Sequence, residues 1–226
     1  MFYFDPTMYL LIPGLLLGIF AQISVKRNFA KYKKVKSKQG ITAEEVCRQM
    51  LTLNNNNGVT IKRISGNLTD NYNPQNNTLS LSDSVYGSTS IASIGVAAHE
   101  CGHAMQKADN YPFLNLRTAI VPIVKIGSSL YFPIFILGLL FSWEPLINIG
   151  IICFGLTFLF SLITLPVEFN ASKRALQMLE KNQFLDAEEI AGVRAVLNAA
   201  AMTYVASMIS SLLQLIRLWL ISRNRD

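Results

Sequence analysis

Long apolar runs alternate with polar stretches along this 226-residue chain. The runs cover residues 8–25, 119–143, 145–166 and 201–221. A helix needs roughly 20 apolar residues to cross a hydrocarbon core about 30 Å thick, and each run approaches or exceeds that length. The pattern therefore predicts a mainly α-helical, membrane-embedded fold. The last run is open to two interpretations, a fourth span or a helix lying on the membrane surface.

The segment between the first two runs mixes polar and apolar residues, which predicts a small α+β part outside the membrane. Thr42 and Glu45 have the spacing of a capping box, so a helix is expected to begin there. Leu79 and Leu81 alternate with polar neighbours, which is typical of a strand. The expected elements are helices over 41–53 and 88–107, strands over 59–64 and 78–82, and a polar turn over 71–77.

The placement of basic residues predicts the orientation of the spans. The net charge is +6, and the densest basic block follows the first apolar run, with no acidic residue between that run and Glu44. Basic residues just beyond a span mark its cytoplasmic flank, so the N-terminus is expected outside. A fourth span would carry Arg223 and Arg225 outward against this tendency and would bury Arg217 at a cost. We lean toward a fourth span.

Composition narrows the class of protein. Hydrophobic residues make up 51% of the chain and charged residues 15%, which favours a membrane protein over a soluble one. No groove-reading module accompanies the basic block, so we expect anionic lipid rather than nucleic acid as its contact. The expected parts are an N-terminal transmembrane anchor (1–25), a cytoplasmic catalytic part (26–118), a transmembrane hairpin (119–166), a cytoplasmic helical segment (167–200) and a C-terminal membrane helix (201–226).

The predicted helix over 88–107 contains His99-Glu100-Cys101-Gly102-His103, an H-E-x-x-H pattern that holds the only two histidines of the chain. Residues four apart lie on one helix face, so both imidazoles can bind one Zn²⁺ ion. Glu100 then stands beside the metal, where a base can take a proton from water. The alternative is an ordinary buried helix, which would bury two imidazoles and a carboxylate without evident partners.

A catalytic zinc site usually has three protein ligands, so an acidic residue must supply the third. Glu168 is the best candidate because two membrane crossings return the chain to the face on which His103 lies. The alternative pairs Glu168 with Lys173 or Arg174. Glu180, Glu188 and Glu189 are expected to be solvated charges. Cys47, Cys101 and Cys153 show no metal-binding spacing.

Two motifs carry a resemblance to a known family: Val96-Ala97-Ala98-His99-Glu100-Cys101-Gly102-His103-Ala104, and Leu165-Pro166-Val167-Glu168-Phe169-Asn170-Ala171-Ser172. With a transmembrane hairpin between them, the chain resembles the YugP-like neutral zinc metallopeptidases of bacterial membranes, which are themselves similar to membrane gluzincins. Gluzincins have an Asp where this chain has Ser172, so the support of one ligating histidine is unassigned. The resemblance also implies a zincin-like catalytic part with a sheet edge that holds extended substrate, for which residues 78–82 are the candidate.

The expected activity is that of a zinc metalloendopeptidase with one Zn²⁺ per chain. Metal ligands would be His99, His103 and Glu168, and Glu100 the catalytic base, with Tyr204 or Arg174 as candidates for oxyanion stabilisation. Its substrates would be membrane proteins or their tails at the cytoplasmic face of a bacterial-type plasma membrane. The alternative is a zinc-binding scaffold or assembly factor without turnover, which would not need Glu100. A regulatory partner and the oligomeric state are left open.

Overall fold

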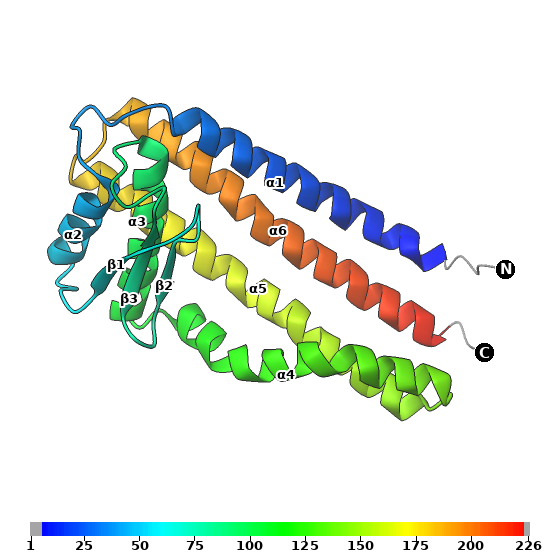
Figure 1. Cartoon of the computed structure of the whole chain (residues 1–226). Helices are drawn as coiled ribbons and strands as arrows, with labels where there is room; N and C mark the ends of the chain where they lie inside the picture. The colour runs from blue at the N-terminus through cyan, green and yellow to red at the C-terminus, as the bar shows by residue number, and fades with distance from the viewer. Residues whose placement is uncertain (1–5, 224–226) are drawn as a thin grey trace. The chain divides into compact units, whose positions relative to one another are not determined.

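The computed structural model describes residues 6–223 and is mainly helical, with one small sheet (Figure 1). The predictions for residues 1–5 and 224–226, Arg225 among them, lie outside the described residues. The elements are a short 3₁₀ helix (Pro6–Leu11), α1 (Ile12–Tyr32), α2 (Ala43–Leu53), β1 (Thr60–Ile64), β2 (Asn71–Asn73), β3 (Thr78–Ser82), α3 (Ile91–Ala108), α4 (Pro112–Leu140), α5 (Glu144–Lys181) and α6 (Ala187–Arg223).

The chain divides into two compact units. One, called here the helical unit, contains Met1–Ala21, Leu116–Leu165 and Met202–Asp226. The other, called the head unit, contains Gln22–Asn115 and Pro166–Ala201. Helices α1, α4, α5 and α6 each contribute residues to both units.

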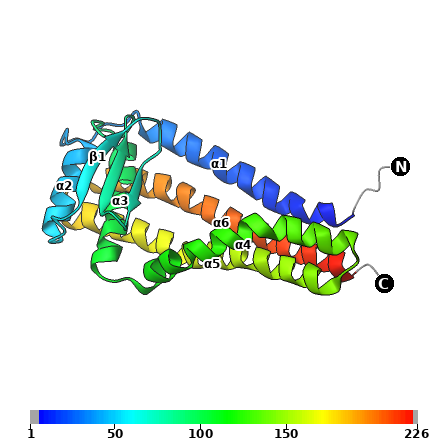
Figure 2. The same cartoon turned by 60° about the horizontal axis from the view of Figure 1, so that its bottom comes forward.

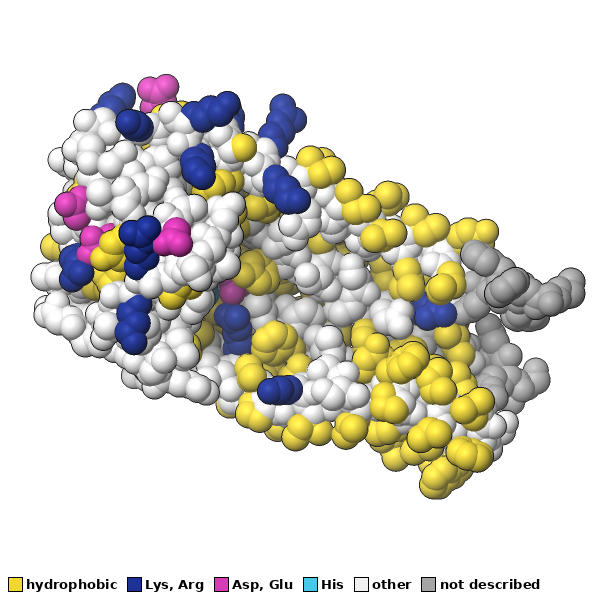
Figure 3. Space-filling view, viewed as in Figure 1, with side chains coloured by type: hydrophobic (Ala, Val, Ile, Leu, Met, Phe, Trp, Pro, Cys, Tyr) yellow, Lys and Arg dark blue, Asp and Glu magenta, His cyan; other side chains and the backbone are white. Residues whose placement is uncertain are grey.

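The helical unit keeps large apolar side chains on its surface. Phe20, Phe141 and Ile152 are 65%, 74% and 67% exposed. Hydrophobic side chains accordingly cover much of this unit in Figure 3. Within the described residues, four helices are long and apolar enough to cross a membrane, with the short 3₁₀ helix counted with α1. A surface of this kind needs apolar surroundings, as lipid provides.

Small residues let the helices of this unit approach closely. A Cβ atom at Gly138 would collide with the backbone of Ile147, and one at Gly14 with Ser210. The hydroxyls of Ser161 on α5 and Ser211 on α6 are 2.8 Å apart and share a hydrogen bond. Small residues and interhelical hydroxyl bonds are typical of helix packing in membranes, where burial against lipid gives no driving force.

The head unit has an ordinary hydrophobic core. Met50 of α2, Leu79 and Leu81 of β3, and Ile94 of α3 are fully buried in one cluster. The predicted capping box is confirmed: Thr42 accepts from the backbone N–H of Glu45, whose side chain accepts from the backbone N–H of Thr42. This unit therefore folds on the same principles as a small soluble domain.

The three-stranded sheet has the order β1-β3-β2. Strand β1 runs parallel to β3, and β2 runs antiparallel to it, with Asn73 opposite Thr78. Two predictions were wrong here. Asn71–Asn73 is a strand rather than part of a turn, because pairing with β3 outweighs the low strand propensity of Asn. Residues 78–82 form the central strand, which pairs with β1 along its whole length and with β2 over residues 78–80, so they are not the free sheet edge that was expected.

Helix α3 packs against α2 and against strands β2 and β3. The views in Figures 1 and 2 both show α3 beside the sheet. Of the two edge strands, β2 is therefore the one that borders α3.

The prediction that Glu189 is a solvated charge was also wrong. Glu189, at the start of α6, is only 4% exposed, and its carboxylate accepts hydrogen bonds from the backbone N–H groups of Lys38 and Asp186.

Candidate metal centre

Helix α3 carries both histidines toward a common point. The helix begins after Ser90, whose hydroxyl accepts a bond from the backbone N–H of Ser93. His99 and His103 lie one turn apart, with ring centroids separated by 4.8 Å and ring planes nearly perpendicular. One face of α3 therefore presents two imidazoles together, as the spacing predicts.

Glu168 of α5 joins the two histidines. Its Oε2 lies 3.2 Å from Nε2 of His99 and 3.6 Å from Nε2 of His103. One ligand atom from each of the three side chains lies within 4.8 Å of the other two. Glu168 is 2% exposed and His103 is 8% exposed, so the cluster is largely withdrawn from water. Arg174, the alternative partner considered for Glu168, pairs with Asp109 instead.

A close crossing of α3 and α5 allows this convergence. Gly102 faces Ala171, and a Cβ at Gly102 would collide with the carbonyl oxygen of Ala171. Gly102 lies one residue before His103, while Ala171 lies one helical turn after Glu168. The glycine in the H-E-x-x-H pattern is therefore what permits the two segments that carry the cluster to touch.

The three side chains suit a divalent metal. Two imidazole nitrogens and one carboxylate oxygen are the donor set of one class of catalytic zinc site, which leaves a further position open. The buried carboxylate of Glu168 and the buried imidazole of His103 are costly unless they are paired or bind a cation. The donor chemistry and the burial of this cluster therefore fit zinc.

Electrostatics in the cluster favour a positive charge. Burial acts to lower the pKa of His103, but its hydrogen bond to Glu168 and the charge of Glu100 outweigh burial, so the pKa of His103 is raised. The protein thus stabilises a proton on this imidazole in the absence of metal. A divalent cation would replace that proton, since ligands bind metals in their deprotonated form.

Each histidine has a second contact through its Nδ1 atom. Nδ1 of His99 lies 3.1 Å from the hydroxyl of Ser172, and Nδ1 of His103 lies 3.0 Å from Oε1 of Gln106. Ser172 occupies the position at which gluzincins have Asp, so it contacts the histidine whose support was unassigned. Sequence reasoning missed Gln106, although its place one turn after His103 on a buried helix was a usable signal.

The remaining predicted site residues, Glu100, Arg174 and Tyr204, have different surroundings. Glu100 lies beside His99 on α3 and is partly exposed, so water can reach it. Arg174 bonds Asn170 and Asp109. Tyr204 lies on α6, in the part of that helix that belongs to the helical unit. The catalytic roles of Glu100, Tyr204 and Arg174 remain predictions.

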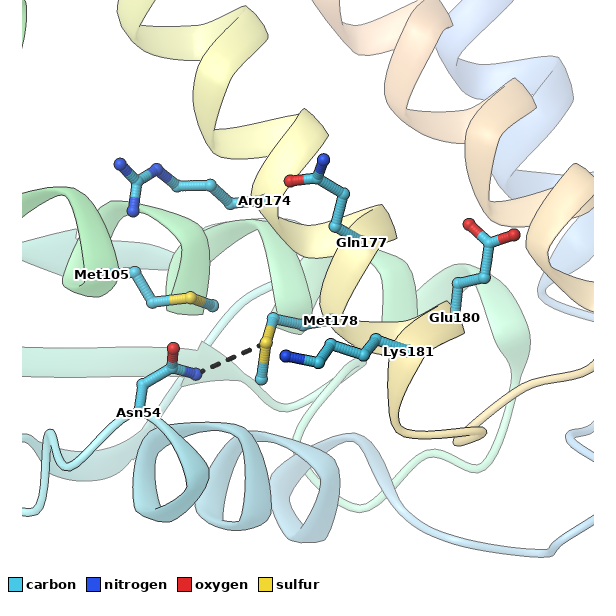
Figure 4. A pocket seen from close by; sticks show the side chains of 7 residues that line it. All are labelled: Asn54, Met105, Arg174, Gln177, Met178, Glu180 and Lys181. Atoms are coloured by element: carbon cyan, nitrogen blue, oxygen red, sulfur yellow. Dashed lines mark hydrogen bonds between the residues drawn. The ribbon is translucent and has the colours of Figure 1, made fainter.

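A separate cavity of about 520 Å³ opens on the head unit (Figure 4). In the close-up, Met105 and Arg174 lie at one end, and the amide of Asn54 bonds the sulfur of Met178 at 3.6 Å. The side chains around this cavity are a mixture of amides, charged groups and methionines. They are Asn54, Met105, Arg174, Gln177, Met178, Glu180 and Lys181.

Comparison with known proteins identifies the family. The model of a family described as "Putative neutral zinc metallopeptidase" matches residues 7–223, almost the whole chain. The chain belongs to this family. The resemblance inferred from the two motifs is thereby confirmed.

Within this neutral zinc metallopeptidase family, one relative is "Putative membrane protease YugP" of Bacillus subtilis (strain 168). It is 43% identical over 217 residues, which are 96% of each chain. No solved structure matches the chain. The family description points to a zinc peptidase, and the relative's name, a membrane protease, agrees with the long apolar helices found here.

Proposed function

We propose that this chain is a membrane-embedded zinc endopeptidase that cleaves membrane proteins or their tails at the cytoplasmic face. The observation that carries the proposal is the convergence of His99 and His103 with Glu168 beside a partly exposed Glu100. The family match supports the metal, and the exposed apolar surface of the helical unit supports the membrane location.

The metal would be one Zn²⁺ per chain, held by His99, His103 and Glu168. Zinc bound there would supply a Lewis acid that polarises the scissile carbonyl and acidifies water. Glu100 takes a proton from the attacking water and passes it to the leaving amine, a role that suits a carboxylate with access to solvent. The two Nδ1 contacts keep the imidazoles directed toward the metal.

Substrate would bind as an added strand along the outer side of β2. Strand β2 pairs only with β3 in the described sheet, and it is the edge that borders α3. Main-chain hydrogen bonds along a free strand edge hold a peptide extended with little regard to its side chains. This placement replaces the central strand as the proposed substrate edge.

The proposed orientation follows the basic residues. The block from Lys26 to Lys38 lies in the head unit, directly after the apolar part of α1. By the positive-inside rule the head unit is cytoplasmic, with α4 and the apolar half of α5 forming a transmembrane hairpin. Helix α6 is proposed as the fourth span, since it is long and apolar enough to cross.

The decisive experiment measures zinc content and cleavage of an unfolded membrane protein by the purified full-length chain. Wild type is expected to hold about one zinc and to cleave, Glu100→Gln to keep zinc without cleaving, and His103→Ala to lose both. Glu180→Gln, which removes an exposed charge lining the separate cavity, is the control and should behave as wild type.

The outcomes separate the proposal from its alternative. Zinc in wild type and in Glu100→Gln, with cleavage by neither, would indicate a zinc-binding scaffold. Equal cleavage by wild type and Glu100→Gln would remove Glu100 from the mechanism. Wild type without zinc would overturn the proposed metal site altogether.

A further inference from the structure

Gln106 is buried beside the metal cluster and uses every polar atom of its side chain. It is fully inaccessible to solvent. Its Nε2 donates to the carbonyl oxygen of Val167 at 2.8 Å and to Oδ1 of Asn170 at 3.0 Å, while its Oε1 lies 3.0 Å from Nδ1 of His103. A buried amide with both N–H groups and its oxygen engaged has a single orientation.

The orientation of this amide can be deduced from its partners. A backbone carbonyl can only accept, so the atom of Gln106 that faces Val167 must be the nitrogen. The oxygen of Asn170 also accepts from Nε of Arg174 at 2.8 Å, which identifies it as an acceptor for Gln106 as well. The amide oxygen of Gln106 therefore faces His103, and this assignment needs no assumption about the histidine.

That oxygen determines the tautomer of His103. An amide oxygen only accepts, so Nδ1 of His103 must carry the hydrogen of their bond. In a neutral imidazole the other nitrogen, Nε2, then has the free lone pair. Nε2 is the atom that lies 3.6 Å from Glu168, on the side where the metal would bind.

The two histidines differ in this respect. The partner of His99 is the hydroxyl of Ser172, which rotates and can either donate or accept. A hydroxyl therefore does not determine the tautomer of His99 by itself. His103 is held by a rigid amide that is bonded in turn to Val167 and Asn170, whereas the support of His99 can adapt.

We propose that Gln106 is a positioning residue of the metal site, which holds His103 in the Nδ1-protonated tautomer with Nε2 directed at the metal. The inference rests on the proposed function, because it assumes that His103 is a metal ligand. Groups that orient a ligating histidine typically contribute about 10–100-fold to metal affinity. Gln106 would do so as a neutral amide instead of a carboxylate.

The test compares Gln106→Met with Gln106→Glu in the full-length chain. Methionine keeps the length of the side chain but cannot accept from Nδ1, so zinc affinity should fall about 10–100-fold, as measured by competition with a chromophoric chelator. Glutamate restores the acceptor and should recover most of the affinity. Both variants lose the bonds donated to Val167 and Asn170, so the metal-free protein should be less stable in both.

Met50→Ala is the control for general destabilisation. Met50 is fully buried in the core of the head unit and belongs to α2, away from the metal ligands in sequence. This variant should lower the melting temperature while leaving zinc affinity unchanged. Recovery of affinity by glutamate without recovery of stability is the pattern that a merely structural glutamine would not produce.

A measurement on wild type needs no variant to fold. The chain has only two histidines, so ¹⁵N-labelled histidine gives a simple spectrum of the zinc-loaded protein. His103 should show a protonated Nδ1 and a metal-bound Nε2.

Three results would overturn the proposal. They are a metal-bound Nδ1 on His103, wild-type affinity in Gln106→Met, and equal losses in Gln106→Met and Gln106→Glu. Absence of zinc from wild type would instead contradict the proposed function, so the two failures are distinguishable.

Discussion

The head unit and the helical unit differ in how far their apolar side chains are exposed and in how their polar side chains are bonded. The head unit buries apolar residues such as Leu79 and Ile94 completely, whereas the helical unit exposes Phe20, Phe141 and Ile152. The two units also differ in how their polar groups are bonded. The head unit buries Glu168 and Gln106 in a bonded network, while the helical unit contains a hydroxyl contact between Ser161 and Ser211.

This contrast between the two units indicates where the chemistry of this chain can be located. Close packing holds charged ligands at defined distances, and the head unit has the buried core that this requires. Among the described residues, the buried cluster of the helical unit is smaller, with Phe135, Ile147, Phe154 and Leu218, and the exposed apolar surface of this unit suits lipid. Variants matched between the units can test the comparison.

The largest effect is expected from Gly102→Ala, with Gly155→Ala as its counterpart in the helical unit. A Cβ at Gly102 collides with backbone of α5, whereas one at Gly155 meets nothing within 4 Å. Gly102→Ala should separate α3 from α5, abolish zinc binding and lower stability by several kcal/mol, roughly 3 or more. Gly155→Ala should change neither. Zinc content and thermal unfolding in detergent measure the effects on metal binding and on stability. Normal zinc content in Gly102→Ala would contradict the inference that the close crossing of α3 and α5 is needed to bring the cluster together.

The next largest effect is expected from Leu79→Ala in the head unit, with Ile152→Ala as its counterpart in the helical unit. Leu79 is fully buried and Ile152 is 67% exposed. Truncating a buried leucine costs about 2–5 kcal/mol, because it removes burial and leaves a cavity. Ile152→Ala should cost under about 0.5 kcal/mol, as surface changes do. Denaturation in lipid-like micelles measures the free energy of unfolding of both variants. Similar losses of stability would mean that the exposed face of α5 packs against protein instead of lipid.

Thr42→Ala should have a smaller effect, confined to the head unit. The variant removes the cap that starts α2, and loss of such a cap costs about 1 kcal/mol. Hydrogen exchange should increase at the first turn of α2, with zinc content unchanged. Increased exchange throughout α3 as well would show that α2 and α3 unfold as one unit.

The smallest effect is expected for Ser211→Ala in the helical unit. This change removes the hydroxyl contact with Ser161, and interhelical hydrogen bonds in membranes contribute about 0.6 kcal/mol on average. Unfolding in mixed micelles should show a loss near that value. A loss above about 2 kcal/mol would indicate that polar contacts matter as much here as in the head unit.

Features that depend on near neighbours could be predicted from the amino-acid sequence alone. The capping box of Thr42 and Glu45, the one-turn spacing of His99 and His103, and the length of the apolar helices all follow from residues a few positions apart. The proximity of Glu168 to the histidines was also predicted from sequence, because the count of membrane crossings placed them on the same face. The structure brings it within 4.8 Å of both histidines.

Features that depend on segments distant in sequence could be seen only in the folded chain. Strand β3 is central because β1 and β2 pair on either side of it, and the alternation of Leu79 and Leu81 does not reveal neighbours. The contacts of Gln106 with Val167 and of Ser172 with His99 arise because α3 crosses α5 at Gly102. Local patterns define which helix forms and which face is apolar, but the pairing of distant surfaces depends on how whole side chains fit together.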